Sequence, residues 1–250
     1  MSFSQRYNLS QPRLTERVRD VLIELIESGE VGADHRLPPE PELAKALGVG
    51  RTTLRAALSL LEQRKLILRR PGIGTLVNPS ALRIRTQITD ETGFQQLIRD
   101  SGHEPGVGFQ AVRQEALSLK AARALRLQDG TKALICERVF LATREPAIFC
   151  VDMVPLALLK KGFAGDEQIR TSIFDFLREY CEEEADYGVA EVLPVNADQR
   201  LARLLDIPAE TALLLLEETY YNNRGEPLLF SEIYYRDDII RFRCIRRVVS

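Results

Sequence analysis

The sequence lacks any apolar run that approaches the roughly 20 residues needed to span a membrane. Its first residues, MSFSQRYNLSQPRLTE, also lack the apolar core of a secretion signal. We therefore expect a cytoplasmic protein with no membrane partner. A length of 250 residues suits two domains better than one or three, and 45% hydrophobic residues can fill two cores.

Cysteine and histidine are too sparse and too scattered for a zinc site of the Cys/His type. No C-x-x-C pair occurs, so the sequence predicts neither a metal nor a cofactor. We expect the thiols to be reduced and mostly buried. The residues concerned are four cysteines, Cys136, Cys150, Cys181 and Cys244, and two histidines, His35 and His103.

Positive charge is not in excess overall, since the formal net charge is −2, but it is unevenly distributed. Residues 1–78 hold 12 Lys and Arg against 9 Asp and Glu, whereas the other 172 residues hold 22 against 27. Between Arg51 and Arg70 there are six basic residues and one acidic residue, Glu62. A local basic patch is what neutralisation of DNA phosphates requires.

The first 78 residues have the pattern of three helices followed by a hairpin. Apolar residues at helical spacing run from Leu14 to Ile26, and a second helix begins near Pro41 and ends at Gly48. A third helix follows, and then two short strands, 66–70 and 75–77, are joined by a Pro-Gly turn. This order predicts a winged helix-turn-helix domain over 1–78 and a linker over 79–89.

The third helix presents a cationic face opposite its apolar face. A major groove admits one α-helix, and Arg51 and Arg55, four residues apart, can each offer a bidentate fork to guanine. Thr52 and Thr53 are short enough to reach phosphates or a thymine methyl group. The alternative is that these arginines form an ordinary solvated face. The apolar face comprises Leu54, Ala57, Leu58 and Leu61.

The hairpin offers a second contact with DNA. Arg69 and Arg70 supply charge, and Gly72 lets the backbone approach a phosphate ridge or a minor groove closely. We therefore predict a DNA-binding surface formed by Arg51, Thr52, Thr53, Arg55, Arg69, Arg70 and Gly72.

Residues 90–250 predict an α+β domain with one mainly antiparallel sheet and packed helices, because strands and helices show no βαβ alternation. The helix candidates are 92–100, 118–126, 172–183 and 197–205. The strand candidates are 107–114, 132–143, 147–154, 187–195, 212–222, 228–236 and 241–248.

Residues 37–77, LPPEPELAKALGVGRTTLRAALSLLEQRKLILRRPGIGTLV, closely resemble the DNA-binding domain of the GntR regulators. The resemblance implies that Arg51, Thr52, Thr53 and Arg55 face the groove and that Gly72 lies at the wing tip. Three positions depart from the family pattern: Gly50 replaces a serine, Lys65 replaces a glycine, and Pro41 replaces an arginine that contacts a base in some relatives.

The rest of the chain resembles the HutC-type branch of that family, whose effector domain, UTRA, is similar to chorismate lyase. PLLFSEIYYRDDIIRF at 227–242, Glu137-Arg138 before Pro146, and TSIFDFL at 171–177 carry this resemblance. It implies a homodimeric repressor whose affinity for double-stranded operator DNA is modulated by a small-molecule effector.

Carried over position by position, the UTRA resemblance implies an effector site. Arg138 could hold an anionic group, and Ser172 could donate to the same group. For each residue the alternative is a structural hydrogen bond, which we favour for Asp238. The predicted contacts are Arg138, Ser172, Phe174, Ser231 and Arg236, with Glu232 and Asp238 as further candidates.

Five positions that are polar in many sugar-phosphate-sensing relatives are apolar here. Because each unpaired buried hydroxyl costs about 1–3 kcal/mol, we expect a weakly hydroxylated organic acid with an apolar body. An alternative function is an enzyme of the chorismate-lyase type with an accessory DNA-binding head, and another is an architectural DNA binder without ligand. The five positions are Phe140, Cys150, Phe174, Leu229 and Ile240.

Overall fold

The computed structural model describes residues 14–28, 35–70, 72–78, 93–160 and 172–244. The chain divides into two compact units, and the second of these spans Ile88–Phe242. The predicted linker, 79–89, lies outside the described residues. Within the described ranges, no helix has both the length and the apolar character needed to cross a membrane.

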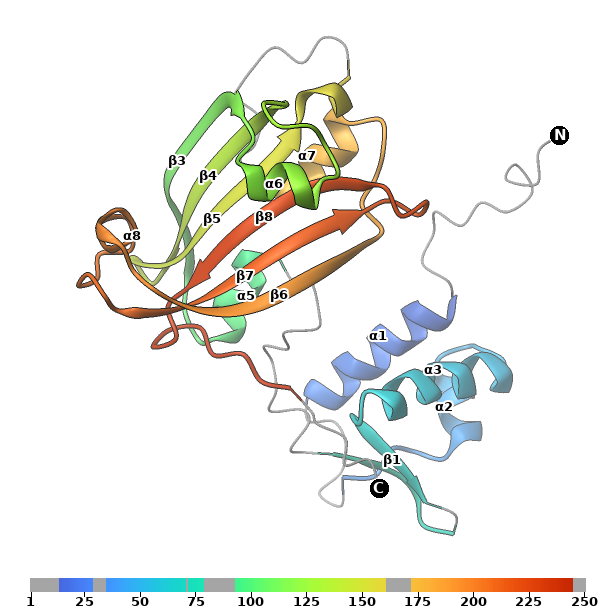
Figure 1. Cartoon of the computed structure of the whole chain (residues 1–250). Helices are drawn as coiled ribbons and strands as arrows, with labels where there is room; N and C mark the ends of the chain where they lie inside the picture. Colours follow the sequence, from blue (N-terminus) through green and yellow to red (C-terminus); the bar gives the residue numbers. More distant parts are fainter. Residues whose placement is uncertain (1–13, 29–34, 71, 79–92, 161–171, 245–250) are drawn as a thin grey trace, which may run out of the picture. The chain divides into compact units, whose positions relative to one another are not determined.

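The first unit contains three helices, α1 (Leu14–Glu27), α2 (Glu40–Ala46) and α3 (Arg51–Gln63) (Figure 1). Pro41 occupies the first turn of α2, where its missing N–H costs no helical hydrogen bond. Gly48 adopts a left-handed conformation (φ 63°) that ends this helix. The helices enclose one core, which includes Leu22, Leu43, Leu54, Leu58 and Leu61.

Strands β1 (Ile67–Arg70) and β2 (Gly74–Val77) form an antiparallel hairpin directly after α3. Ile67 and Val77 pair at its base and are buried in the helical core, so the hairpin is attached to the helices. Gly72 lies at the tip with φ 76°, a left-handed conformation that glycine adopts at little cost. This is the winged helix-turn-helix arrangement that the sequence predicts.

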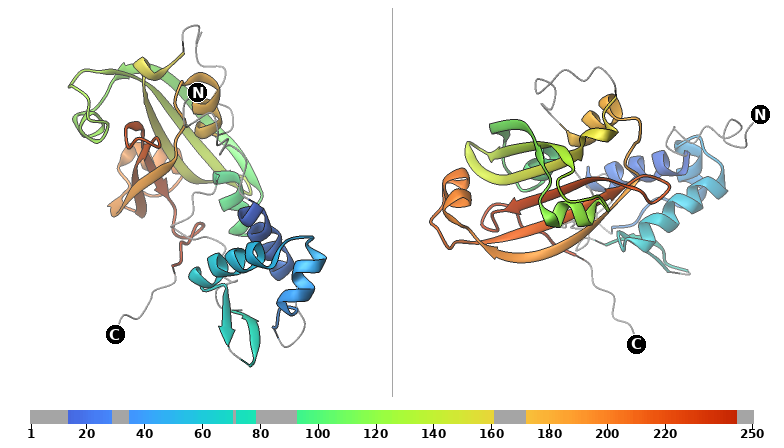
Figure 2. Two further views of the ribbon diagram at one scale, coloured as in Figure 1. Left: turned by 90° about the vertical axis from the view of Figure 1, so that its right-hand side faces the viewer. Right: turned by 45° about the horizontal axis from the view of Figure 1, so that its top comes forward.

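The second unit is built on a six-stranded antiparallel sheet with strand order β3-β4-β5-β8-β7-β6. Neighbouring strands pair over long stretches, as in the register from Leu214–Tyr235 to Tyr221–Pro227 between β7 and β8. The sheet is strongly twisted (Figure 2). Its strands are β3 (Pro105–Ala116), β4 (Lys132–Ala142), β5 (Glu145–Pro155), β6 (Tyr187–Asn196), β7 (Ala212–Tyr221) and β8 (Pro227–Tyr235).

Helices cover both faces of this sheet (Figures 1 and 2). On one face, α6 (Leu119–Ala124) and α8 (Gln199–Leu205) pack against alternate residues of the strands, such as Ile135 and Val139. On the other face, α5 (Phe94–Asp100) packs beside Phe140, and α7 (Ile173–Tyr180) packs beside Leu134. Successive residues of β4 thus point into different cores, as the period of a strand requires.

The predicted α+β fold class is confirmed, and the elements of both units lie where the sequence places them. The predicted strand at 241–248 does not form over residues 241–244, the part that the structure describes, where Arg243 makes only an isolated β-bridge. Ile240 is buried against the sheet, and the remainder, 245–248, lies outside the described residues.

Substitution of Lys65 tests whether the backbone is strained at the end of α3. It adopts a left-handed conformation with φ 60°, which costs a residue with a Cβ atom about 1–2 kcal/mol. We expect Lys65→Gly to raise the free energy of unfolding by about 0.5–1 kcal/mol, because the relief of strain exceeds the entropic cost of glycine. Denaturant titration of the full chain would measure this change.

Arg64→Gly is the matched control, since it removes the same charge from the adjacent position, where φ is −78°. There glycine relieves no strain, and we expect a loss of roughly 0.5–1 kcal/mol. Equal destabilisation by both variants would contradict the expected relief of backbone strain at Lys65.

Candidate functional sites

Helix α3 presents its polar face to solvent. Arg51, Thr52 and Arg55 are exposed and Thr53 is half-buried, whereas Leu54 and Leu58 are fully buried. Gly50 caps the helix through its extended backbone conformation and supplies no side-chain hydrogen bond. Arg51, Thr52 and Arg55 are therefore accessible on the polar side of α3, whereas Thr53 is only partly accessible.

Glu40 at the start of α2 holds Arg55. Its Oε2 accepts a hydrogen bond from Arg55 Nε at 2.7 Å, although the Arg55 side chain remains 66% exposed. This hydrogen bond and the charge of Glu40 raise the pKa of Arg55. Solvent weakens such an exposed pair, so Arg55 can exchange Glu40 for a phosphate or a base.

Arg69 ties the hairpin to α3. It donates to Glu62 Oε2 at 3.0 Å and to Ser59 Oγ at 2.6 Å, and its backbone N–H donates to Glu62 Oε1. Arg69 is half-buried, whereas Arg70 and Gly72 are exposed. Arg69 thus positions the hairpin in this structure, while the other two predicted wing residues lie at the surface.

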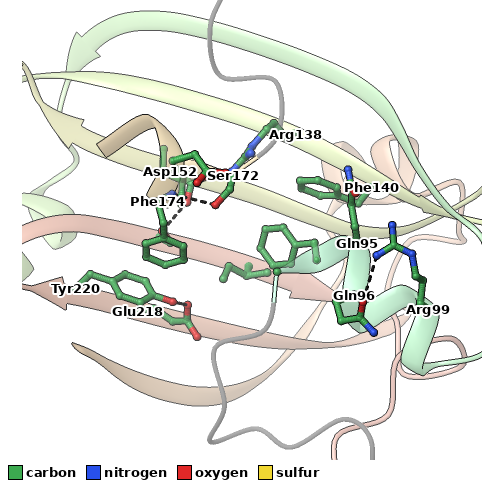
Figure 3. A pocket seen from close by; sticks show the side chains of 16 residues that line it. Gln95, Gln96, Arg99, Arg138, Phe140, Asp152, Ser172, Phe174, Glu218 and Tyr220 are labelled. Atoms are coloured by element: carbon green, nitrogen blue, oxygen red, sulfur yellow. Dashed lines mark hydrogen bonds and ion pairs between the residues drawn. The ribbon is translucent and has the colours of Figure 1, made fainter. Parts of the chain in front are cut away.

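A cavity of about 280 Å³ opens between α5, α7 and the sheet of the second unit. Aromatic side chains line it together with polar ones such as Gln95, Gln96 and Arg99 (Figure 3). Phe94 lies 4.7 Å from Phe140 between ring centroids, and Phe174 lies 4.9 Å from Tyr220 in an edge-to-face arrangement. A flat apolar ligand would therefore meet aromatic rings from two directions.

A buried ionic cluster forms part of the cavity floor. Asp152 Oδ2 accepts from Arg138 at 2.5 Å and from the Cys150 thiol at 3.3 Å, and Asp152 Oδ1 accepts from Ser231 Oγ at 2.6 Å. Burial lowers the pKa of Arg138, but the Asp152 carboxylate more than offsets this effect, so that pKa is raised overall. Arg138 is therefore a fixed positive charge beneath the cavity, and it also lies 5.3 Å from the Phe140 ring centroid.

A second polar group on the floor was not predicted from the sequence. Glu218 on β7 is only 6% exposed, and its Oε2 accepts from the Tyr220 hydroxyl at 2.5 Å. The two side chains lie on the same face of β7 because they are two residues apart. A segment that contains adjacent Glu217 and Glu218 does not by itself show which of them lies in a cavity.

Ser172 and Phe174 line the cavity from the start of α7. Ser172 Oγ caps that helix by accepting from the Phe174 backbone N–H at 3.2 Å. The hydroxyl proton is not used in this contact, and it can be donated to a ligand. Four predicted effector residues, Arg138, Ser172, Phe174 and Ser231, thus lie around one cavity.

The fifth predicted effector residue, Arg236, lies elsewhere. It donates to the Pro146 carbonyl at 2.9 Å and pairs with Asp238 at 2.7 Å, and it is not among the residues that line the cavity. Glu232 pairs with Lys120 across the other face of the sheet at 2.8 Å. All three side chains have structural partners at these positions, as we favoured for Asp238.

Comparison with known families identifies both units. The model of the bacterial regulatory proteins of the gntR family matches residues 14–77, and the UTRA domain model matches residues 100–241, more than half of the chain. The chain belongs to the GntR family, in its HutC-type branch with a UTRA domain.

Curated relatives align along most of the chain. It is 27% identical over 219 residues to the transcriptional repressor NagR of Bacillus subtilis, covering 87% of this chain and 88% of that one. It is 28% identical over 223 residues to the histidine utilization repressor of Pseudomonas putida, covering 86% of this chain and 79% of that one. These relatives are regulators, so the enzyme alternative is not favoured.

Solved structures share the fold. YydK, a possible transcriptional regulator from B. subtilis, superposes with a TM-score of 0.73 at 18% identity, covering 94% of this chain and all of that one. PhnF from Mycobacterium smegmatis superposes with a TM-score of 0.57 at 22% identity, covering 93% and 100%. These superpositions show the fold alone. The family matches and the curated repressors show that the protein is a transcription regulator that binds operator DNA and a small-molecule effector.

Gly188 on β6 allows a test of how the cavity is built. It pairs directly with Tyr220, and a Cβ atom at this position would lie 2.7 Å from the Tyr220 ring. We expect Gly188→Ala to displace that ring and to cost about 1–3 kcal/mol of folding free energy, measured by denaturant titration.

Val189→Ala is the control for Gly188→Ala, because it changes an adjacent side chain that is 53% exposed. We expect it to be within about 0.5 kcal/mol of the wild type. In a Tyr220→Leu background, Gly188→Ala should cost less folding free energy, because the ring that its Cβ would meet is gone. Strictly additive effects of the two substitutions would argue against a clash between that Cβ and the Tyr220 ring.

Proposed function

We propose that the protein represses transcription as a homodimer, and that a small organic acid bound in the UTRA cavity lowers its affinity for the operator. The relatives named as repressors support repression of transcription over activation. A two-fold dimer would place two α3 helices on half-sites about 34–36 Å apart, or a multiple of that spacing. Sedimentation analysis with and without operator would test this assembly.

We further propose that Arg51, Thr52, Thr53 and Arg55 contact bases and phosphates from α3, while Arg70 and Gly72 contact the backbone from the hairpin. The observation that carries this proposal is the exposed cationic edge of α3 opposite its fully buried apolar face. Arg69 acts chiefly by fixing the hairpin to Ser59 and Glu62.

Substitution of the α3 arginines tests the DNA surface. We expect Arg51→Ala and Arg55→Ala each to cost about 1–3 kcal/mol of operator binding, because each removes a bidentate donor. Arg123→Ala, which removes an exposed arginine from α6 in the other unit, is the matched control. Fluorescence anisotropy with operator and scrambled duplexes would measure both affinities, and unchanged operator binding in both α3 variants would contradict the assignment.

The effector proposal rests on the size and lining of the cavity. Its volume of about 280 Å³ is at the lower limit of the roughly 300–1,000 Å³ of drug-sized ligand sites, so the effector is small. Arg138 supplies a buried guanidinium for an acidic group. Phe140 and Phe174, two of the five apolar replacements, line the cavity, whereas Leu229 and Ile240 are buried in the cores behind it.

A ligand screen tests this proposal. We expect small aromatic or unsaturated carboxylates to raise the melting temperature of the full chain and to weaken its operator binding. Amino-sugar phosphates are the control set, since Phe140 and Phe174 line the cavity at two positions that are polar in many sugar-phosphate-sensing relatives. Tight saturable binding of amino-sugar phosphates together with no binding of organic acids would contradict the proposed ligand class, but not the DNA-binding role.

A further inference from the structure

The sheet of the second unit has two outer strands, β3 and β6, and they differ in how their outer edges are protected (Figure 1). An outer edge presents N–H and C=O groups that can pair with another strand, and natural sheets protect such edges with bulges and charged side chains. Strand β3 has both devices. Its register with β4 shifts between Val107 and Gln110, and it carries the ion pair of Arg113 and Glu115. It is therefore poorly suited to receive a further strand.

Strand β6 has little of this protection. All ten of its residues pair with β7 without a register shift, and Glu191 is its only charged residue. Three of its apolar side chains, Tyr187, Val189 and Val192, are exposed. A long, regular and apolar outer strand is a template for β-sheet pairing. Among the strands that the structure describes, only β7 pairs with it.

The backbone groups of β6 that face away from β7 belong to its even-numbered residues. Ala197, directly after the strand, donates its N–H to the carbonyl of Thr211, the next position in the register. Because backbone groups alternate along an antiparallel strand, the odd-numbered residues of β6 point toward β7 and the even-numbered ones away from it. Pro194 agrees with this assignment, since a proline in an edge strand lies where its missing N–H would face away from the neighbour. The residues that direct both an N–H and a C=O outward before this proline are Gly188, Ala190 and Val192.

This outward segment is complementary to itself. A two-fold axis perpendicular to the sheet at Ala190 makes two copies of β6 antiparallel, so that Ala190 lies opposite the partner's Ala190 and Gly188 lies opposite the partner's Val192. Each opposed pair then exchanges two N–H···O bonds, and every outward N–H of the segment finds a C=O. An axis at Val192 would instead place Pro194 opposite the partner's Ala190 and lose hydrogen bonds, because proline has no N–H.

We propose that β6 is the dimerisation strand: two copies of the protein pair antiparallel through β6 about Ala190, and the two sheets become continuous across the two-fold axis. This inference rests on the proposed homodimer and names the surface that forms it. A second copy is the occupant that the strand itself specifies, since 188–192 supplies both the donors and the acceptors of the pairing. It also brings together the two DNA-binding units that a two-fold symmetric operator requires.

Cross-linking tests the position of the axis on the full chain. A Cys244→Ser background is used because Cys244 is exposed and the other three cysteines are buried. Opposed residues of a hydrogen-bonded antiparallel pair have Cα atoms about 5.5 Å apart, within the range of a disulfide. We expect Ala190→Cys to form a covalent dimer when dissolved oxygen and copper phenanthroline are the oxidant. Val192→Cys is the matched control and should form none, since Val192 and the partner's Val192 would lie four residues apart along the strands, about 13–14 Å.

A change of charge tests the same surface without oxidation. Ala190→Lys places two ammonium groups opposite each other across the axis, and we expect the dissociation constant of the dimer to rise roughly 10-fold. Ala190→Glu should act similarly, and an equimolar mixture of the two variants should associate more tightly than either alone, because position 190 faces itself. Val107→Lys, at an exposed residue of β3, is the matched control and should leave association unchanged. Sedimentation velocity over a dilution series would measure each sample.

Three results would overturn the inference. A monomeric wild-type chain would eliminate both pairing through β6 and the proposed homodimer. A wild-type dimer that Ala190→Lys leaves unchanged would retain the homodimer but place its interface elsewhere. Faster cross-linking at Val192 than at Ala190 would exclude the proposed axis. Operator binding, measured on the same samples, tests the DNA-binding role separately.

Discussion

Asp152 lies in the middle of the sheet and is only 2% exposed, so its carboxylate needs hydrogen bonds and a positive charge from neighbouring side chains. The side chains on the cavity floor are arranged to provide them. Loss of one member of such a pair leaves an uncompensated buried charge. Asp152 receives Arg138 from β4, Ser231 from β8 and the Cys150 thiol from its own strand. The same contacts that satisfy the carboxylate therefore hold the Arg138 guanidinium at a fixed place beneath the cavity.

The arginines of the DNA-binding unit follow the opposite principle. Arg55 is paired with Glu40 at the surface, where water screens the pair, as the proposed contact with DNA requires. Arg69 is more enclosed and contacts both Glu62 and Ser59, so it fixes the hairpin beside α3. Burial thus distinguishes an arginine that positions an element from one that can leave its partner for a ligand.

The predictable parts of the structure are those specified by local periodicity. The three helices, the wing and the two long hairpins follow from apolar spacing and turn residues, and a family resemblance supplied four of the cavity residues. Arg236 and Glu218 show the limit of this reasoning. Arg236 follows β8 and contacts Pro146, and Glu218 lies in the cavity while Glu217 does not; both facts depend on which strands are neighbours.

Regulation requires that the effector bind two arrangements of the domain with different affinity. The strands on the cavity floor are held by hydrogen bonds to neighbours on both sides, so they resist displacement. Helix α5, by contrast, has seven residues and is held to the sheet mainly through buried Leu97 and Ile98. It also contributes Phe94 to the cavity wall and is the first described helix after the segment that leads from the DNA-binding unit. A ligand that binds against Phe94 therefore contacts the described helix that follows the DNA-binding unit most closely in the sequence.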